Sequence, residues 1–343
     1  MTIFVGPNAV GKTNIVEGIQ VMTAIESFRH PQIRHLIKEG HDQGMISANL
    51  QDGKRNVDVE LLLFEGKRRY LFNGKPKKSS DLKSLCPSVA FCPDDLNLVK
   101  GSDAPRRQAL DSLISQLSGN HQIICRDYGN VIKHKNALLK DGADDVLLRS
   151  INEMVISCGA QLIGYRLRLF KKLKDYIALR YESIVVARET LSCDYHPTWT
   201  EEENLFSLSV DEIKMMISQK LEDVFEEEKR RGRSLVGPHR DGISYSVDGK
   251  DATVYASQGQ QRSIVLAQKL SEVALIQDIL GQQPILLLDD VMSELDEQRR
   301  QTLVRFMEES MQVFITTTNL AYFDSSMLKN ADVITLPLTV DAF

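Results

Sequence analysis

A glycine-rich run in the first fifteen residues has the composition of a phosphate-binding loop. Its members match the pattern GxxxxGK[ST] and are Gly6, Pro7, Asn8, Ala9, Val10, Gly11, Lys12 and Thr13. In this pattern backbone N–H groups point at phosphate, at the positive end of the helix that follows. We expect Lys12 to bridge the β- and γ-phosphates of ATP and Thr13 to ligate Mg²⁺. The alternative is a glycine-rich turn ahead of an ordinary helix.

Two adjacent carboxylates form the second candidate for chemistry. Asp289 and Asp290 end the apolar run from Ile285 to Leu288, and successive side chains of a strand point in different directions. We assign Asp289 to the Mg²⁺ shell and Asp290 to polarisation of the attacking water, so that Asp290 and Lys12 are the catalytic pair. An aspartate at a strand end is also a common turn former or helix cap, and the pairing with Lys12 is what favours catalysis.

A third element precedes a long predicted helix from about Gln258 to Leu280. The hydroxyl of Ser257 and the backbone N–H of Gly259 would face outward at the helix N-terminus, together with Gln260, and form an anion site. An N-cap serine followed by a flexible glycine is the alternative. The order of this element, a long helix and a carboxylate strand resembles that of ABC ATPases, in which the element reaches the γ-phosphate held by the opposite subunit.

Two further segments lie close to the carboxylates. The run Ser293-Glu294-Leu295-Asp296 resembles the ABC D-loop, although a helix cap at Ser293 with acidic first-turn residues is compatible with it too. The run Thr316 to Asn319 ends the next predicted strand, where many ABC proteins place a switch histidine. Thr318 or Asn319 could hydrogen-bond the γ-phosphate but could not act as a charged sensor, so we expect slow hydrolysis.

The elements that must position these residues predict an α/β fold. Short apolar runs typical of buried strands occupy Thr2–Val5, Ile285–Leu288, Val313–Thr316 and Val333–Leu336, and paired strands with an Asn73-Gly74 turn are expected over Val57–Phe64 and Arg69–Phe72. Long helical stretches fill the middle of the chain. The pattern predicts an ABC-ATPase-like P-loop head from residues 1–104 and 234–343, with an inserted α-helical lid or arm domain from residues 105–233.

Composition limits the classes of protein that the chain could represent. The 343 residues carry 42 Lys+Arg and 47 Asp+Glu, a net charge of -5, which excludes histone-like binding to phosphate backbones; any nucleic-acid contact must be local. Five scattered cysteines without a CxxC pair indicate reduced thiols in a cytosolic protein. No uninterrupted apolar run approaches the roughly 20 residues of a membrane span. We therefore expect a cytoplasmic protein that contacts no membrane.

The motifs together resemble the RecF family of DNA replication and repair proteins. Two further segments carry the likeness: Pro93–Gly101 followed by Arg106, Arg107, Leu110 and Asp111, and the run Val236–Asp241. The resemblance covers nearly the whole chain in the family's order. It implies ATP and Mg²⁺ as cofactors, an ATP-dependent homodimer, and weak ATP hydrolysis stimulated by DNA. It further implies binding to gapped or single-strand/double-strand junction DNA and cooperation with RecR and RecO in loading recombinase.

One departure from the family precedes the P-loop. RecF-like proteins usually carry roughly twenty more residues there, forming the first strands, whereas Met1 stands almost on the loop in this sequence. We expect a chain without those strands to lose an edge of its sheet and part of the contact with the nucleotide base. That loss would lower stability and affinity rather than change the identity of the protein.

Basic residues of the middle region could contact DNA phosphates. One group is Arg166, Arg168, Lys171, Lys172 and Lys174, and a second is Lys229, Arg230, Arg231 and Arg233. Solvated helix faces balanced by nearby acidic residues are the alternative.

Two other functions use the same nucleotide chemistry: an ATP-binding subunit of an ABC transporter, and a scaffold that holds nucleotide without hydrolysis. The region from Pro105 to Leu235 is longer and more helical than the coupling surface of a transporter requires.

Overall fold

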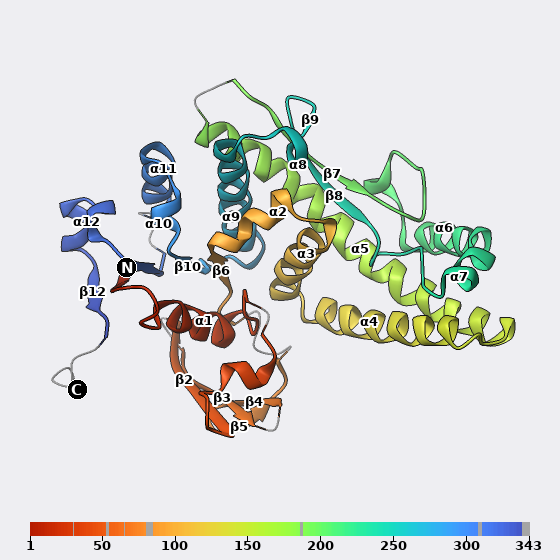
Figure 1. Ribbon diagram of the computed structural model, residues 1–343, viewed down its shortest axis with the longest axis horizontal. Helices are drawn as coiled ribbons and strands as arrows, with labels where there is room; N and C mark the ends of the chain where they lie inside the picture. Colours follow the sequence, from red (N-terminus) through yellow and green to blue (C-terminus); the bar gives the residue numbers. More distant parts are fainter. Residues whose placement is uncertain are drawn as a thin grey trace. The chain divides into compact units, whose positions relative to one another are not determined.

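Both ends of the chain contribute to one of its two structural units (Figure 1). The computed structural model describes residues 1–29, 31–52, 55–64, 66–79, 85–185, 188–307 and 311–337. Unit 1 comprises Met1–Asp95 and Glu272–Phe343, and unit 2 comprises Leu96–Ser271. The helix α9 (Gln258–Leu280) crosses the boundary between them.

The boundaries of the two units differ from the domain boundaries predicted from the sequence, mainly at the second junction. Residues 234–271, assigned to the head from their sheet-like pattern, fall in unit 2. The physical reason is strand pairing: β8 (Gly242–Val247) forms an antiparallel ladder with β7 (Leu191–His196), and β9 (Lys250–Asp251) extends it. The hydrogen bonds of these strands tie the segment to unit 2.

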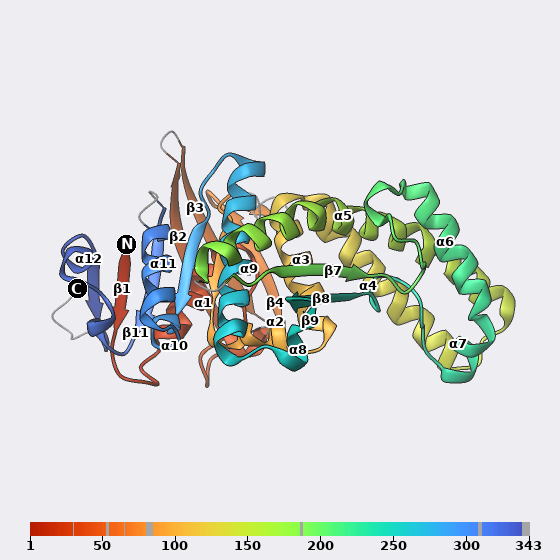
Figure 2. The same cartoon turned by 90° about the horizontal axis from the view of Figure 1, so that it is seen from above.

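Unit 2 is mainly helical. Its helices are α2 (Asn97–Lys100), α3 (Asp103–Leu117), α4 (Gly119–Lys140), α5 (Asp145–Ile184), α6 (Val210–Asp223), α7 (Phe225–Arg231) and α8 (Ala252–Tyr255), with a 3-10 turn at Leu205–Ser207. Figure 2 shows α4 and β7 lying along α5, which also packs against α3 and α6. The long helix α5 is therefore the central element of this unit.

Helix α5 resembles a membrane-spanning helix in its length and apolar character. Among the residues that the structure describes, it is the one helix that could cross a membrane by length and composition. Half of its apolar window is buried inside the protein, and Val155, Ile163 and Phe170 are almost fully enclosed. Its neighbours on several sides make it the core helix of unit 2.

Unit 1 contains a five-stranded sheet in the order β12-β1-β11-β10-β6, in which every pairing is parallel. The strands are β1 (Thr2–Val5), β6 (Ser88–Phe91), β10 (Ile285–Asp289), β11 (Val313–Thr317) and β12 (Asp332–Thr335). Most of their side chains on both faces are buried, as expected for a parallel sheet covered by helices. The predicted α/β fold class is confirmed.

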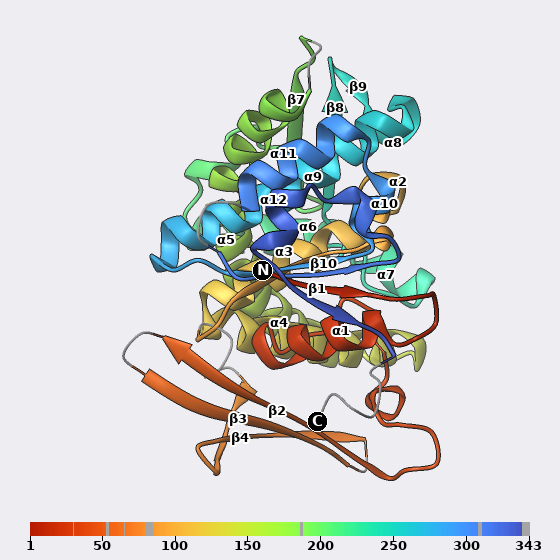
Figure 3. The same ribbon diagram turned by 90° about the vertical axis from the view of Figure 1, so that its left-hand side faces the viewer.

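The helix α1 (Lys12–Thr23) lies between this sheet and a second, antiparallel sheet (Figure 3). The second sheet has the order β2-β3-β4-β5, with β2 Gln43–Asp52, β3 Arg55–Phe64, β4 Lys67–Phe72 and β5 Lys75–Lys77. The predicted Asn73-Gly74 turn joins β4 to β5, and both residues have the positive φ, 48° and 72°, that a tight hairpin requires. Unit 1 also contains α10 (Val291–Glu294), α11 (Glu297–Met307) and α12 (Ser325–Lys329). Short 3-10 turns occupy Ile33–Leu36 and Leu320–Tyr322, and another at Pro93–Leu96 spans the first junction.

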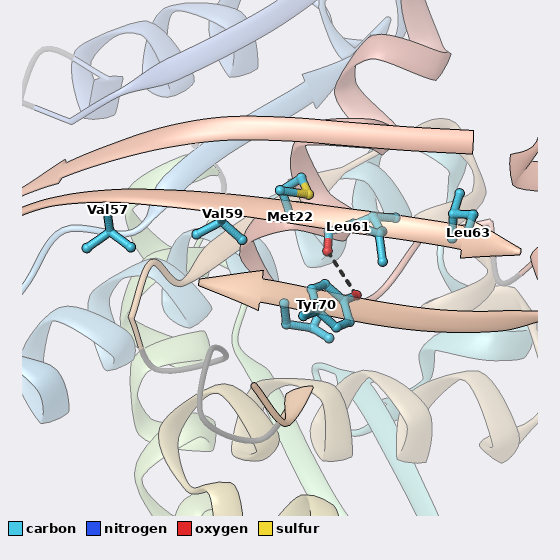
Figure 4. Close-up of a cluster of buried hydrophobic side chains, with 8 residues drawn as sticks. Met22, Val57, Val59, Leu61, Leu63 and Tyr70 are labelled. Carbon is cyan, nitrogen blue, oxygen red and sulfur yellow. Dashed lines mark hydrogen bonds between the residues drawn. The ribbon is translucent and has the colours of Figure 1, made fainter. Parts of the chain in front are cut away.

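An apolar cluster fixes α1 to the second sheet. Alternate residues of β3, namely Val57, Val59, Leu61 and Leu63, point into it alongside Met22 and Tyr70 (Figure 4). Burying one such aliphatic side chain contributes about 1.5–3 kcal/mol. The Tyr70 hydroxyl also donates a hydrogen bond of 3.5 Å to the Val21 carbonyl. The helix that follows the glycine-rich loop is thus held on both of its sides.

Candidate nucleotide site

The register of the strands brings the residues that were predicted to bind and hydrolyse ATP to one edge of the parallel sheet. Val5, the last residue of β1, lies beside Thr317 of β11, and Asp289 of β10 lies beside Thr316. Because β11 stands between β1 and β10, the glycine-rich loop and the two carboxylates emerge from its two sides. The carboxyl ends of strands are where open α/β sheets bind their ligands.

The glycine-rich loop has the backbone of an anion-binding turn. Ala9 and Gly11 adopt left-handed conformations, with φ of 65° and 100°, and such turns direct successive N–H groups to one side. Within the described part of the chain, the N–H groups of residues 8–13 donate to no protein acceptor. A non-glycine residue at positive φ stores strain and is found preferentially at functional sites. The loop therefore presents a set of free donors at the start of α1.

The glycine-rich loop and the segment at Leu336 approach each other so closely at Gly6 that only glycine fits there. A Cβ atom at this position would lie 2.5 Å from the carbonyl oxygen of Leu336. The N–H of Leu336 in turn donates to the carbonyl of Val5 at 2.7 Å, which fixes the end of β12 beside the loop. Any side chain at residue 6 would push this pairing apart.

Lys12 points back into the loop. Its ammonium group donates two hydrogen bonds of 2.8 Å, to the carbonyl oxygens of Gly6 and Pro7, and its side chain is buried. Neither acceptor is a carboxylate, so the positive charge has not been neutralised by an ion pair in this arrangement. A buried ammonium held only by carbonyl groups is a strong attractor for an anionic ligand.

One hydroxyl positions both carboxylates. The side chain of Thr316 is fully buried; it donates to a carboxylate oxygen of Asp289 at 2.7 Å and accepts from the N–H of Asp290 at 3.0 Å. Within the run from Thr316 to Asn319, a role was predicted for Thr318 or Asn319 and none for Thr316. A buried threonine on the strand beside the carboxylates was the signal that could have identified it.

Asp290 stands in a strained and partly dehydrated position. Its φ is 54°, in the left-handed region, and its Oδ1 atom is buried without a hydrogen-bond partner. Burial raises the pKa of Asp290 above its ordinary value; nearby Lys12 opposes the rise and Asp289 adds to it. A carboxylate with a free buried oxygen and a raised pKa is suited to accept a hydrogen bond from water.

The donor set at this edge fits Mg²⁺. Magnesium prefers hard oxygen ligands, and the Thr13 hydroxyl and the Asp289 carboxylate supply two from the ends of α1 and β10. Asp290 follows Asp289 directly, and its orphaned oxygen could accept a hydrogen bond from a water molecule of the shell. These residues would hold the ion.

Asn319 and Thr318, the two candidates for a γ-phosphate sensor, differ in whether the side chain already makes a hydrogen bond to the backbone. The Asn319 side chain accepts from the N–H of Ala321 at 2.9 Å and so caps the following turn. Thr318 is exposed. In the D-loop segment, Ser293 lies inside α10 and donates to the carbonyl of Asp290, while Asp296 accepts from the N–H of Arg299 ahead of α11. The alternative of a helix cap at Ser293 is therefore wrong, and Asp296 caps α11.

Ser257 lies in unit 2, at the exposed N-terminus of the 23-residue helix α9. Its hydroxyl accepts from the N–H of Gln260 at 3.2 Å, and its own N–H donates to the Gln260 side chain at 2.8 Å. This reciprocal pair is a capping box, and it holds the serine at the positive end of the helix dipole. The two preceding side chains, Val254 and Tyr255, are 68% and 70% exposed, so the helix start carries an apolar surface beside it.

An apolar cavity of about 540 Å³ lies elsewhere in unit 1. It runs along the face of α1 from Asn14 to Thr23 and is bounded by consecutive residues of β2 from Ile46 to Gln51. Neither Lys12 nor the two carboxylates line it. Among the described residues that line it there is no lysine or arginine, so it lacks the features of a phosphate site.

The segments that carry the family resemblance hold unit 2 together. The buried carboxylate of Asp241 accepts from the Tyr195 hydroxyl at 2.6 Å and from the Trp199 indole at 3.1 Å. The Arg107 guanidinium donates to the Asp241 carbonyl at 2.5 Å. Asp111 binds Arg166 in a bidentate pair of 2.8 and 2.7 Å. Burial alone would raise the pKa of Asp111, but the Arg166 charge lowers it to about 2.

Four of the nine basic residues that could contact DNA are engaged within unit 2. Arg166 is buried, and it also donates to the Pro238 carbonyl at 2.6 Å, so its proposed contact with DNA is wrong. Lys229, Arg230 and Arg231 all pair with acidic side chains on α5 or α7.

Asp111 also lies near His121 and Cys125 in a cluster that could hold a metal. Arg166 occupies both oxygens of that carboxylate.

Comparison with known proteins decides the family. Residues 1–336 match the model of the RecF/RecN/SMC N terminal domain. A DNA replication and repair protein RecF from Lactobacillus delbrueckii subsp. bulgaricus is 34% identical over 339 residues, which cover 96% of this chain and 87% of the relative. The chain belongs to the RecF family. A second RecF, from Alkaliphilus oremlandii, is 37% identical over 93% of this chain and 87% of its own length.

Solved structures agree with membership of the RecF family. The recombination mediator protein RecF-ATPrS in the RecFOR pathway matches with a TM-score of 0.86 at 28% identity, over 94% of this chain and 87% of that one. The corresponding RecF-ATP structure matches with a TM-score of 0.85 at 27% identity, over 94% of this chain and 87% of that one. An SMC head domain from Pyrococcus furiosus shares the fold at 16% identity, with a TM-score of 0.50 over 97% of this chain and 86% of that one. This RecF-family protein therefore has the ABC-type ATPase head common to both groups.

Replacing Lys12 with Met should weaken ATP binding. A hydrogen bond to a charged group contributes about 1.5–3 kcal/mol, so we expect affinity to fall by roughly one to two orders of magnitude. Calorimetric titration with ATP and Mg²⁺ measures the change, with Lys329→Met, an exposed lysine of α12, as the control. Undiminished affinity in Lys12→Met would refute the assignment of the loop.

Proposed function

We propose that this RecF-family protein is an ATP-dependent DNA-binding repair ATPase that closes as a homodimer around ATP. In the closed state two copies enclose two ATP molecules, and each glycine-rich loop faces Ser257 of the other copy. The dimer binds gapped or single-strand/double-strand junction DNA. With RecR and RecO it promotes recombinase loading in recombinational repair and replication restart, and hydrolysis then releases the clamp.

The observation that carries this proposal is the set of free N–H groups around residues 8–13, with the buried Lys12 ammonium among them. Six free donors and one uncompensated cation match the negative charge of a triphosphate better than any neutral ligand. Two carboxylates at the same sheet edge supply the remaining polar chemistry. The names of the RecF relatives in the RecFOR pathway support the assignment to DNA repair.

The geometry suggests how each side chain would act. Lys12 would exchange the Gly6 and Pro7 carbonyls for phosphate oxygens, because charge-assisted bonds to phosphate are stronger than bonds to neutral acceptors. Asp290 would orient the attacking water through its free oxygen. Mg²⁺ held by Thr13 and Asp289 would neutralise negative charge on the phosphates.

The dimer follows from the exposed end of α9. Ser257 and the N–H of Gly259 stand at the N-terminus of a long helix, with Gln260 fixed against Ser257 by the capping box. A γ-phosphate of another copy would meet both the hydroxyl and the positive helix end. Exposed Val254 and Tyr255 beside the serine would lose solvent on contact, which adds apolar burial to the association.

Slow turnover is part of the proposal. Hydrolysis in this arrangement relies on Asp290 and on neutral groups at Thr318, without a histidine at the end of β11. A neutral sensor stabilises the developing charge less than a cation does. The ATP-bound dimer should accordingly persist long enough to act as a clamp.

Replacement of Asp290 with Asn should trap the dimer. The amide cannot accept a proton from water, so hydrolysis should fall by at least about 100-fold while ATP binding persists. Static light scattering with saturating ATP and Mg²⁺ should report twice the 38.7 kDa mass of one chain. The double variant Asp290→Asn/Ser257→Arg, which places a bulky side chain at the contact, is the matched control and should remain monomeric. A strictly monomeric Asp290→Asn protein under saturating ATP contradicts the proposal.

Phosphate release separates the three classes of function that share this chemistry. We expect slow release that gapped duplex DNA stimulates severalfold, because DNA held across two copies favours the closed state. Blunt duplex of the same length is the control for DNA structure. Release that ignores DNA would support a transporter-type ATPase, and the absence of release would support a nucleotide-binding scaffold.

A further inference from the structure

We propose that the hairpin formed by β4 and β5 of unit 1 is a phosphate-binding surface for duplex DNA. The inference rests on the proposed function, which requires DNA binding but assigns it no surface. It commits to one partner, the sugar-phosphate backbone of a duplex, and to contacts that follow charge without reading base sequence.

Charge is concentrated in this hairpin against the trend of the whole chain. Residues 66–79 contain six basic side chains and no acidic one, in a protein of net charge -5. The six are Lys67, Arg68, Arg69, Lys75, Lys77 and Lys78. Like charges at such density repel one another, so the hairpin gains stability when a polyanion approaches.

Five of the six basic side chains are exposed and have no hydrogen-bond or ion-pair partner among the described residues. Lys67, Arg69, Lys75, Lys77 and Lys78 are exposed, and within the described residues none of them makes a hydrogen bond or an ion pair. The basic residues of α7 in unit 2 are engaged with acidic partners instead. The hairpin cations can bind phosphate without first breaking an ion pair.

The strand register presents part of this charge on the outer face of the sheet. Tyr70 is buried against α1, so its neighbours Lys67, Arg69 and Leu71, at odd positions of β4, face the other side. Lys67 and Arg69 stand two residues apart, roughly 6.8 Å along the strand. The tight Asn73-Gly74 turn fixes β5 next to β4, with Lys75 and Lys77 directly opposite Phe72 and Tyr70. These two lysines therefore extend from the other face of the hairpin, so that its charge is divided between both faces.

The acidic side chains of the same sheet do not cancel this charge. Asp58 and Glu60 lie on the described part of β3, and Asp58 already accepts a hydrogen bond of 2.7 Å from Asn49 on β2. Glu60 lies opposite Leu71 in the ladder. Both carboxylates stand on the face that carries Lys67 and Arg69, and the six basic side chains of the whole hairpin outnumber them by four.

A lysine-rich edge strand has another common explanation. Charged residues on an edge prevent pairing with the sheets of other molecules, which would account for Lys75 and Lys77 on β5. It also applies to Lys67 and Arg69, because β5 pairs only with Tyr70 to Phe72 and leaves the first half of β4 paired on one side. Edge protection and phosphate binding therefore use the same side chains, and the affinity for DNA distinguishes the two roles.

The test compares two triple variants in the full-length chain. The hairpin variant is Lys67→Gln/Arg69→Gln/Lys77→Gln. The control is Lys133→Gln/Arg305→Gln/Lys329→Gln, which removes the same charges from exposed positions on α4, α11 and α12. Binding of gapped duplex DNA in ATP and Mg²⁺ is measured by fluorescence anisotropy from 50 to 200 mM salt. ATP affinity and the unfolding temperature verify that both variants remain intact.

Each phosphate contact contributes about 0.9 to the slope of log affinity against log salt. We expect the hairpin variant to lose roughly three units of slope and on the order of 100-fold in affinity at 0.1 M salt, with the control close to wild type. If the wild-type protein binds DNA and the hairpin variant matches it in affinity and slope, the inference is overturned and the proposed function stands. If the wild-type protein fails to bind DNA with ATP, both are overturned. Equal losses in the two variants also overturn the inference. It is likewise overturned if the hairpin variant binds DNA as the wild-type protein does but no longer binds phosphatidylglycerol vesicles.

Discussion

Parallel pairing of β11 with β1 on one side and β10 on the other is the constraint on which the nucleotide site depends. This register sets the glycine-rich loop and the carboxylates across one strand width, roughly 4.8 Å to each side of β11. A slip of one residue would turn Asp289 away from the Thr316 hydroxyl, since neighbouring side chains point to opposite faces. The site is therefore specified by the sheet before any ligand is present.

Packing holds α1 from both of its sides. The helix α1 is held against the parallel sheet by Val16 and against the antiparallel sheet by the cluster around Leu61 and Tyr70. Movement of α1 would carry Lys12 and the free N–H groups of its first turn away from the carboxylates. In unit 2, the buried Asp241 network similarly joins β7 to the segment ahead of β8, on the path to α9 and Ser257. Both halves of the proposed closed site thus rest on rigid scaffolds.

The nucleotide-binding residues can be proposed from the sequence because each pattern involves neighbours along the chain: a loop between a strand and a helix, and carboxylates at the end of an apolar run. The strands predicted at Thr2–Val5 and Ile285–Leu288 are confirmed, and the second extends to Asp289. Thr316 was missed because its importance comes from pairing with a strand distant in the sequence. Arg166 was misread for the same reason: its partner Asp111 lies 55 residues away. The second unit boundary depends on the β7–β8 ladder, which leaves no mark near residue 234.

A crystal structure of the protein with a non-hydrolysable ATP analogue and Mg²⁺ tests the nucleotide site most directly. We expect the triphosphate to lie among the N–H groups of residues 8–13, with the Lys12 ammonium moved from the Gly6 and Pro7 carbonyls onto phosphate oxygens. Ser257 of a second copy should lie within hydrogen-bond distance of the γ-phosphate. An analogue bound elsewhere, with Lys12 still on the loop carbonyls, or a bound triphosphate whose γ-phosphate meets no second copy, would contradict the account.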